Sequence, residues 1–500
     1  MTQQLPGGWI SISLPEVADL IMGQSPPSTT YNTSKNGLPF FQGKTEFGDL
    51  YPTPETYCDT PGKIAEAGDV LISVRAPVGP TNLCQIRSCI GRGLAALRPK
   101  EEIPSKYLLY YLRNIEPWLS QQGTGSTFTA ISKSDLQEIE ILLAPLAEQR
   151  RIVAKLEVLL SKVDASRKRL KRIPVISKRF REAVLSAACD GRLTADWRQG
   201  NSHPECAEVL LRLMQVERKT KWEAKHVGRR YPPPQAMEER DLPAIPESWV
   251  WVNFDQCTWE ITVGHVGPMR ERYIPEGRPF LRSQNVRPLR FDPAGRVFIP
   301  EDFHEVLAKS ALYGGEILVV RSGANTGDCC VFPKGFGEAN CSDLVIARPL
   351  SGLLPEYGAA YVASPQGQAH LALHETGIAQ PHFNIGAMRV KPFPLPPKAE
   401  QQEIVKRTNE LFAFADQVEA RYLKAKTHVD RLTQSILAKA FRGELVPQDP
   451  NDEPAAALLE RLKSAPTEAP PPMRRGRPRK STPVEVPPPK RRGRPRKTVV

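Results

Sequence analysis

The residues whose type and spacing point most directly to chemistry lie near the C-terminus. The sequence Arg-Arg-Gly-Arg-Pro-Arg-Lys at 474–480 recurs unchanged at 491–497. Residues 466–500 contain eleven Lys or Arg against two Glu, a net charge of +9 out of +13 for the whole chain. The other 465 residues therefore carry only +4, so the attraction for polyanions is concentrated in this segment.

Each repeat has an Arg-Gly-Arg-Pro core and resembles the AT-hook, which lies extended in the minor groove of DNA. Narrow A·T-rich grooves concentrate negative potential that attracts arginine, and glycine lets the backbone sit deep. A merely solubilising tail is the alternative, but the unchanged repetition favours the minor groove. We expect residues 466–500 to be disordered and to contact DNA through Arg475, Gly476, Arg477, Pro478, Arg492, Gly493, Arg494 and Pro495.

The rest of the sequence lacks the patterns that catalysis or metal binding would need. Residues 41–45 look like the end of a phosphate-binding loop, but Leu38 stands where that motif needs glycine, which favours a strand and turn. The methyltransferase tetrapeptide Asn/Asp-Pro-Pro-Phe/Tyr is missing, and Glu223 and Lys225 have no partner acid for a nuclease site. Nine cysteines without a Cys-x-x-Cys pair and eight scattered histidines suggest no metal site. We predict no catalytic residue, and no metal or cofactor bound by this chain.

An internal duplication organises the elements that must position any site. Ala-Glu-Gln at 147–149 recurs at 399–401, and this offset of 252 residues holds without a gap across 47 residues. Steps of three or four residues from Ile152 and from Ile404 meet apolar residues at nine of eleven positions in each copy. Such a narrow stripe predicts two long helices that pair as an antiparallel coiled coil, the first kinked near Pro174.

The segments before these helices match more loosely. A Pro-x-x-Trp entry at 6–9 parallels 246–249, and a Gly-acid-apolar strand at 68–72 parallels 315–319. A short helix is expected after each, around 106–113 and 356–363. The fold class is therefore α/β (α+β): two globular domains in tandem, separated by the long helices. The predicted order is globule 1 (1–145), helix 1 (146–192), a short helix and Pro-rich linker (193–245), globule 2 (246–397), helix 2 (398–445), a short helix (446–465) and the tail (466–500).

Two loops in each half could reach DNA, one after a buried strand and one after the short helix. Arginine can contact phosphate or base, and glycine permits close approach of the backbone. Tight turns with an incidental arginine explain the same residues equally well. The candidates are Arg75, Gly79, Gly123, Ser126, Thr127, Arg321, Gly323, Asn325 and Thr376.

These features together are similar to the specificity subunit of Type I restriction–modification enzymes. The carrying motifs are Pro-Leu-Ala-Glu-Gln at 145–149, Pro-Lys-Ala-Glu-Gln at 397–401, and Leu-Ala-Lys-Ala-Phe-Arg-Gly-Glu-Leu at 437–445, whose counterpart is 183–193. The resemblance covers residues 1–465. It implies that the globules are target-recognition domains, each reading one half of a bipartite double-stranded DNA site, and that the helices form the spacer between them.

The resemblance also implies partners. The chain would be non-catalytic and would assemble with two methyltransferase subunits that use S-adenosylmethionine, and with restriction subunits that use ATP and Mg. An architectural protein that binds A·T-rich DNA mainly through its tail is the alternative, and a two-domain coiled-coil adaptor is a simpler one. The sequence has no run of eighteen apolar residues and no secretory signal, so we expect a cytoplasmic protein without a membrane span.

Overall fold

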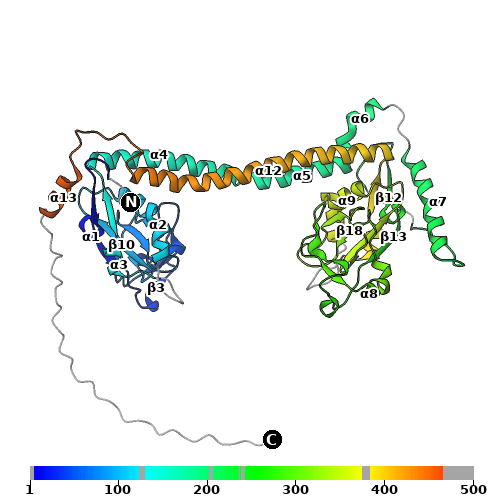
Figure 1. Ribbon diagram of the computed structural model, residues 1–500, viewed down its shortest axis with the longest axis horizontal. Helices are drawn as coiled ribbons and strands as arrows, with labels where there is room; N and C mark the ends of the chain where they lie inside the picture. Colours follow the sequence, from blue (N-terminus) through cyan, green and yellow to red (C-terminus); the bar gives the residue numbers. More distant parts are fainter. Residues whose placement is uncertain are drawn as a thin grey trace, which may run out of the picture. The chain divides into compact units, whose positions relative to one another are not determined.

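The computed structural model describes residues 5–122, 130–201, 206–235, 237, 242–373 and 383–464. The chain divides into two compact units (Figure 1). Unit 1 comprises Met1–Leu159 and Gln434–Val500, and unit 2 comprises Leu160–Thr433. Each unit therefore combines one globule with the start of one long helix and the end of the other. The predicted tail contacts, together with Gly123, Ser126, Thr127 and Thr376, lie outside the described residues.

The globule of unit 1 is built from three antiparallel or mixed sheets. Its first strand pairs with its last, and a four-stranded sheet in the order β2-β10-β7-β8 forms its centre. A five-stranded sheet, β3-β5-β4-β9-β6, contains the parallel pair β4 and β9. The strands are β1 (Ile10–Ser13), β2 (Ala18–Met22), β3 (Tyr31–Asn32), β4 (Leu38–Phe41), β5 (Thr56–Cys58), β6 (Ile64–Ala65), β7 (Val70–Ser73), β8 (Thr81–Leu83), β9 (Ser88–Ile90), β10 (Leu94–Pro99) and β11 (Glu140–Leu143).

The globule of unit 2 repeats this plan. Its first and last strands pair, its central sheet has the order β13-β21-β18-β19, and a parallel pair, β14 and β20, stands where unit 1 has β4 and β9. The duplication therefore extends to strand order, although the sequences of the globules diverge. The strands are β12 (Val250–Asn253), β13 (Thr258–Val263), β14 (Arg278–Leu281), β15 (Val286–Arg287), β16 (Arg290–Phe291), β17 (Val297–Ile299), β18 (Ile317–Val320), β19 (Cys329–Val331), β20 (Asn340–Cys341), β21 (Leu344–Pro349) and β22 (Pro392–Leu395).

The helix after each central sheet is longer than the sequence suggested. Residues 106–113 belong to α2 (Ser105–Gln122), and residues 356–363 belong to α9 (Pro355–Ala363), which α10 (Pro365–Leu373) follows after one residue. The helix of unit 1 continues nine residues beyond the expected end at 113, with Pro117 inside it. The smaller helices of the two globules are α1 (Leu14–Val17), α3 (Lys133–Gln137), α8 (Glu301–Val306) and α11 (Ile385–Arg389).

Two tyrosines four residues apart hold the last strand of each globule. The hydroxyls of Tyr107 and Tyr111 donate to carbonyl oxygens of β11 at 2.7 and 2.8 Å. The hydroxyls of Tyr357 and Tyr361 donate to carbonyl oxygens of β22 at 2.8 and 2.6 Å. Because residues four apart lie on one face of a helix, each helix clamps the strand that leads into its long helix.

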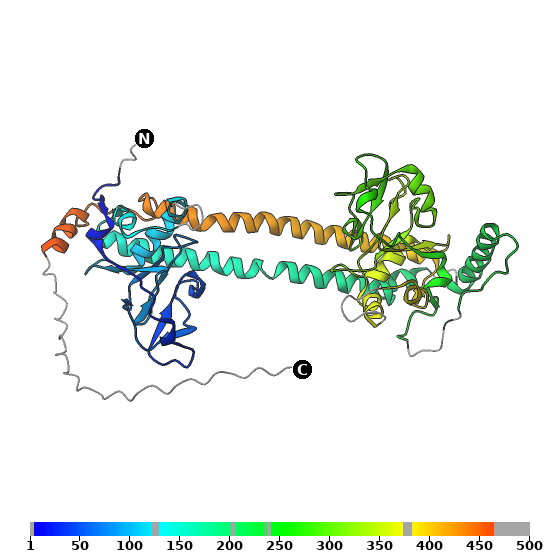
Figure 2. The ribbon, with the colours of Figure 1, turned by 90° about the horizontal axis from the view of Figure 1, so that it is seen from below.

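The long helices are α4 (Leu146–Leu170), α5 (Ile173–Cys189) and α12 (Lys398–Phe441). Pro174 lies in the first turn of α5, where a proline costs no hydrogen bond. Within unit 2, Arg181 pairs with Asp416 at 2.6 Å, while Arg167 pairs with Asp430 at 3.5 Å. The partners of Arg167 and Arg181 follow one another in the opposite order along α12, so the helices run antiparallel in this unit (Figure 2).

A further helix closes each unit beyond the long ones. In unit 2, η3 (Arg192–Thr194), α6 (Ala195–Gly200) and α7 (Ala207–Lys225) follow α5, and the backbone N–H of Ala207 donates to Ser248 O at 3.2 Å. In unit 1, α13 (Ala455–Ser464) follows α12, and the N–H of Ala455 donates to Gly8 O at 2.9 Å. Both helices therefore begin against the Pro-x-x-Trp entry of their own globule.

Candidate nucleic-acid interface

A buried tryptophan–glutamate hydrogen bond joins each globule to its long helix. Trp9 Nε1 donates to Glu148 Oε2 at 2.9 Å in unit 1, and Trp249 Nε1 donates to Glu400 Oε2 at 2.8 Å in unit 2. Both carboxylates are buried, with at most 1% of their surface exposed. The Ala-Glu-Gln repeat therefore marks the joint that fixes the orientation of each globule on its helix.

The glutamine of the same repeat completes the joint. Gln149 Nε2 donates to Ala144 O at 2.8 Å, and Gln401 Nε2 donates to Pro396 O and Gly352 O at 3.0 Å each. These bonds satisfy carbonyls of the segment that enters each helix and, in unit 2, a carbonyl of the turn after β21, where a buried backbone group would otherwise lack a partner.

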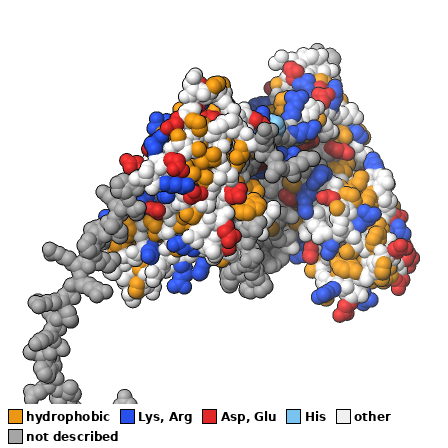
Figure 3. Space-filling model, turned by 60° about the vertical axis from the view of Figure 1, so that its left-hand side comes forward, with side chains coloured by type: hydrophobic (Ala, Val, Ile, Leu, Met, Phe, Trp, Pro, Cys, Tyr) orange, Lys and Arg blue, Asp and Glu red, His pale blue; other side chains and the backbone are white. Residues whose placement is uncertain are grey.

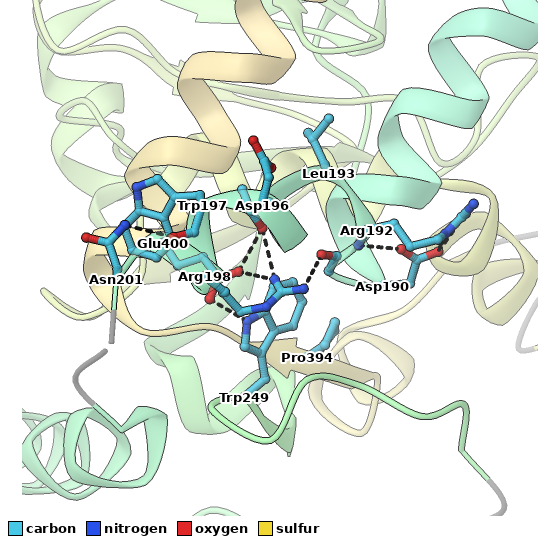
Figure 4. Close-up of polar contacts among 12 residues, drawn as sticks. Asp190, Arg192, Leu193, Asp196, Trp197, Arg198, Asn201, Trp249, Pro394 and Glu400 are labelled. Atoms are coloured by element: carbon cyan, nitrogen blue, oxygen red, sulfur yellow. Dashed lines mark hydrogen bonds and ion pairs between the residues drawn. The ribbon is translucent and has the colours of Figure 1, made fainter. Parts of the chain in front are cut away.

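The two joints differ in the second oxygen of the glutamate. In unit 2, Glu400 Oε1 accepts from Thr194 Oγ1 at 2.7 Å and forms an ion pair with Arg198 (Figure 4). The equivalent positions in unit 1, 252 residues further on, are Val446 and Pro450, which cannot donate from a side chain. Glu148 Oε1 has no hydrogen-bond partner among the described residues, and burial raises the pKa of this carboxyl.

A hollow of about 650 Å³ lies at the ends of the central strands of unit 1. Gly23 ends β2 here, and its N–H donates to Leu94 O at 2.9 Å; a Cβ on Gly23 would lie 2.1 Å from Gly91 O. This close backbone approach brings the loops after β2, β4, β7 and β9 to one place. The hollow is lined by Ser25, Gln42, Gly43, Lys44, Thr45, Ser73, Arg75, Ala76, Pro77, Arg92 and Gly93.

Unit 2 has the same backbone arrangement with different side chains. Gly264 N–H donates to Leu344 O at 2.8 Å, which repeats the bond of Gly23. His265 N–H donates to Cys341 O at 2.8 Å, so His265 stands where Gln24 stands in unit 1. Arg282 donates to Gly295 O at 2.9 Å, and Arg321 lies 3.9 Å from Asp343. The two strand-end surfaces therefore share a frame but present unlike chemistry.

The residues predicted from the sequence to contact DNA lie in different parts of the two globules. Arg75 is exposed and lines the hollow together with residues 42–45, which belong to the segment predicted to be a strand and turn. Gly79 lies against α2 instead, since a Cβ there would lie 3.1 Å from the side chain of Glu116. Gly323 and Asn325 are exposed in the loop after β18.

Arg75 and Arg321 are not equivalent in the structure. Val74 O accepts from Ile131 N–H at 3.0 Å, and Arg321 O accepts from Phe383 N–H at 3.0 Å. Arg321 therefore matches Val74, one residue before Arg75, and only Arg75 lies in the exposed loop. A shift of one residue turns a side chain to the other face of a strand, which explains why Arg321 is partly buried.

Several residues of these surfaces escaped the sequence analysis. Gly23, Gln24 and Arg92 were not singled out, nor were Gly264 and His265. The usable signal was a pair of glycines that end corresponding strands, at Gly23 and Gly264. Their offset of 241 residues differs from the 252 of the helices, because the loops of the two globules differ in length.

The described surface has a mixed charge. On the face drawn in Figure 3, Lys and Arg side chains are interspersed with Asp and Glu, in keeping with a net charge of +4 outside residues 466–500. Among the described residues, no group of three or more His, Cys, Asp or Glu is placed to hold a metal ion. No helix in the described part of the chain is long and apolar enough to cross a membrane.

Comparison with known proteins finds similarity to one family. Residues 6–175 match the family model described as the Type I restriction modification DNA specificity domain. The chain is 29% identical over 492 residues to the EcoKI specificity subunit of Escherichia coli K12, covering 92% of this chain and 96% of that one. It is 40% identical over 186 residues to the MjaX specificity subunit of Methanocaldococcus jannaschii, covering 37% of this chain and 44%, less than half, of that relative.

Among solved structures, the crystal structure of the HsdS subunit from Thermoanaerobacter tengcongensis is 57% identical over 33% of this chain and 40% of that chain, with a TM-score of 0.30. Several further relatives carry the same description of specificity subunit of a Type I restriction enzyme. The names of these relatives agree with the expectation of a specificity subunit.

Proposed function

We propose that this chain, a specificity subunit of the Type I restriction–modification kind, reads a bipartite DNA site with one half-site for each unit. The observation that carries the proposal is the repetition of one strand-end frame, Gly23 with Leu94 and Gly264 with Leu344, in two globules. Two recognition domains with the same frame suit a DNA site that has two parts. Because the side chains on the two frames differ, the half-sites should differ in sequence.

The long helices supply the separation. A helix of 44 residues such as α12 is about 66 Å long, and half-sites on one face of B-DNA recur about 34 Å apart. The buried joints of Glu148 and Glu400 keep each globule from turning on its helix. A spacer of fixed length would turn two short recognition events into one site with a defined gap.

The chemistry belongs to partner subunits in this proposal. The relatives are named as subunits of restriction enzymes, so this chain would dock two methyltransferase subunits that use S-adenosylmethionine. Restriction subunits that use ATP and Mg would complete the assembly. This chain would recognise the DNA sequence and contribute no reacting group.

The test is a map of methylated adenines in the host genome, with and without this chain. The proposal expects a two-part motif with a constant gap that vanishes when the chain is deleted. An unchanged map would refute the proposal.

We further propose that the repeats at 474–480 and 491–497 act as an accessory clamp in the minor groove of A·T-rich DNA. The support is their unchanged repetition and the net charge of +9 in residues 466–500. Removing these residues should weaken DNA binding and reduce its dependence on salt, while the methylated motif stays the same. Loss of the motif would mean that the tail takes part in sequence recognition.

A further inference from the structure

We propose that the hollow of unit 1 is a binding site for a backbone phosphate of DNA, formed by Lys44, Arg75 and Arg92. The inference rests on the proposed DNA-reading function and assigns a role within it. This site would fix the register of unit 1 on the duplex and carry no sequence preference of its own.

The charge of the hollow is the first argument. Its lining residues include three cations and no Asp or Glu. Lys44, Arg75 and Arg92 are exposed, and none of them forms an ion pair within 4.0 Å with another described residue. Glu116 interacts electrostatically with Lys44 but does not line the hollow. The nearest acid along the loop, Glu46, accepts from the N–H of Gly43 at 3.1 Å. Unpaired cations around one hollow concentrate positive potential, which attracts an anion.

The shape of the hollow is the second argument. A phosphate protrudes from a duplex, whereas base edges lie recessed in a groove, so a concave basic site fits a phosphate. Nothing lies within 4 Å of a Cβ built on Gly43, so the backbone there is open to close approach. Gly93 has no such room, because its Cβ would lie 2.3 Å from Gln42 O. A larger residue at 93 would push the loop that carries Lys44 away from the arginines.

The polar groups between the cations are oriented by the chain itself. Ser25 Oγ accepts from Arg92 N–H at 3.3 Å, and Ser73 Oγ donates to Arg75 O at 3.0 Å. These contacts hold the backbones of both arginines while their guanidinium groups stay free to meet a ligand. A site whose backbone is fixed loses less conformational entropy on binding.

Among its described residues, unit 2 has no such group of unpaired cations on the same frame. Arg282 donates to Gly295 O at 2.9 Å and lies 5.8 Å from the ring centre of Tyr273. Arg321 lies 3.9 Å from Asp343. Cations that already have protein partners gain less from a phosphate. The electrostatic anchoring of the two units to DNA is therefore unequal.

The double variant Arg75→Gln, Arg92→Gln tests the site in the assembled enzyme. Each lost phosphate contact lowers the slope of log K against log salt by about 0.9. The double variant removes the contact with one phosphate, so between 50 and 200 mM salt its affinity should change about 3.5-fold less than that of the unaltered protein. The matched control is Arg87→Gln in the same unit, an exposed arginine that pairs with Glu66 at 3.4 Å and does not line the hollow. This variant should leave the slope nearly unchanged.

Methylation mapping of the same variants separates the outcomes. The proposal expects weaker binding to every duplex and the same methylated motif. An unchanged salt slope, or a changed first half-site, would overturn the phosphate site even if a two-part motif is present. Thermal unfolding of the double variant should match that of the unaltered protein, because both side chains are exposed. A methyl phosphonate at one phosphate of the first half-site should remove the difference in affinity between the variant and the unaltered protein. If no phosphate position has this effect, the proposal is also overturned.

Discussion

The two glutamates of the Ala-Glu-Gln repeat should respond in opposite ways to one substitution. Glu400 accepts from Trp249 at 2.8 Å and from Thr194 at 2.7 Å, and it pairs with Arg198. Glu148 accepts from Trp9 at 2.9 Å, and its other oxygen has no partner among the described residues. We expect Glu400→Gln to destabilise unit 2 and Glu148→Gln to leave unit 1 unharmed or slightly more stable.

The structure sets the size of the difference. Removing one partner of a buried ion pair costs about 3–5 kcal/mol, and Arg198 is 19% exposed, so water recovers part of this. We expect a loss of about 2–3 kcal/mol for Glu400→Gln, or about 5–10 °C in the melting temperature of a unit of this size. Glu148→Gln should change stability by less than about 1 kcal/mol, because the amide keeps an oxygen for Trp9.

The effect of Glu148→Gln on stability should also depend on pH. Burial raises the pKa of Glu148 above 4.5, so its ionised form disfavours the fold once the pH exceeds the pKa of the unfolded chain. Any gain from Glu148→Gln should therefore be present near neutral pH and disappear below about pH 4.5.

Calorimetry of both variants and of the unaltered chain, at pH 7 and at pH 4, measures these effects. Equal losses in the two variants would refute the argument, since it depends on the missing donors at Val446 and Pro450.

Three further predictions follow from the helices, the turns and a buried lysine. Deleting residues 164–170 and 427–433 together should shorten the spacer by about 10 Å, and methylation mapping should show the gap reduced by about three base pairs with both half-sites unchanged. Gly191→Ala and Gly443→Ala should each lower the free energy of unfolding by at least about 1–2 kcal/mol, measured by chemical denaturation. The reason is that φ is +84° at Gly191 and +74° at Gly443, and the added Cβ would lie 2.4 and 2.5 Å from a proline side chain. An unchanged free energy of unfolding would contradict this. Burial lowers the pKa of Lys391 to about 7 from 10.5, so unfolding free energy should rise between pH 7 and 10.5, and Lys391→Met should abolish that rise.

The parts of the fold that the sequence could predict are those with strict spacing. The 252-residue offset and the three-to-four periodicity identified the long helices, because helix pairing needs one side chain every turn. The Pro-x-x-Trp entries were found as well, but not their role: the hydrogen bond from Trp9 to Glu148 joins residues 139 positions apart. Local patterns cannot show such a contact.

The candidate site was harder to predict because it lies in loops. Arg75 could be named, since it follows a clear apolar strand. Its neighbour Arg92 comes from another loop. The pairing of β7 with β10, extended by the bond from Val74 N–H to Gly93 O at 3.0 Å, brings the two arginines close. The partial burial of Arg321 depends on a register that differs by one residue from that of Arg75. The match of 68–72 with 315–319, an offset of 247 residues, already places Arg321 opposite Val74, whereas the spacing within the loops contains no information about the approach of Arg92.

The most direct test of the account uses the duplication itself. Replacing residues 246–397 by residues 6–145 would give a chain with two copies of the first globule, each joined to its own helix by the same Trp–Glu hydrogen bond. Methylation mapping with this chain should reveal a symmetric motif: the first half-site, the original gap, and the inverted complement of the first half-site. A folded, assembled variant that still methylates the original asymmetric motif would contradict the claim that each unit reads its own half.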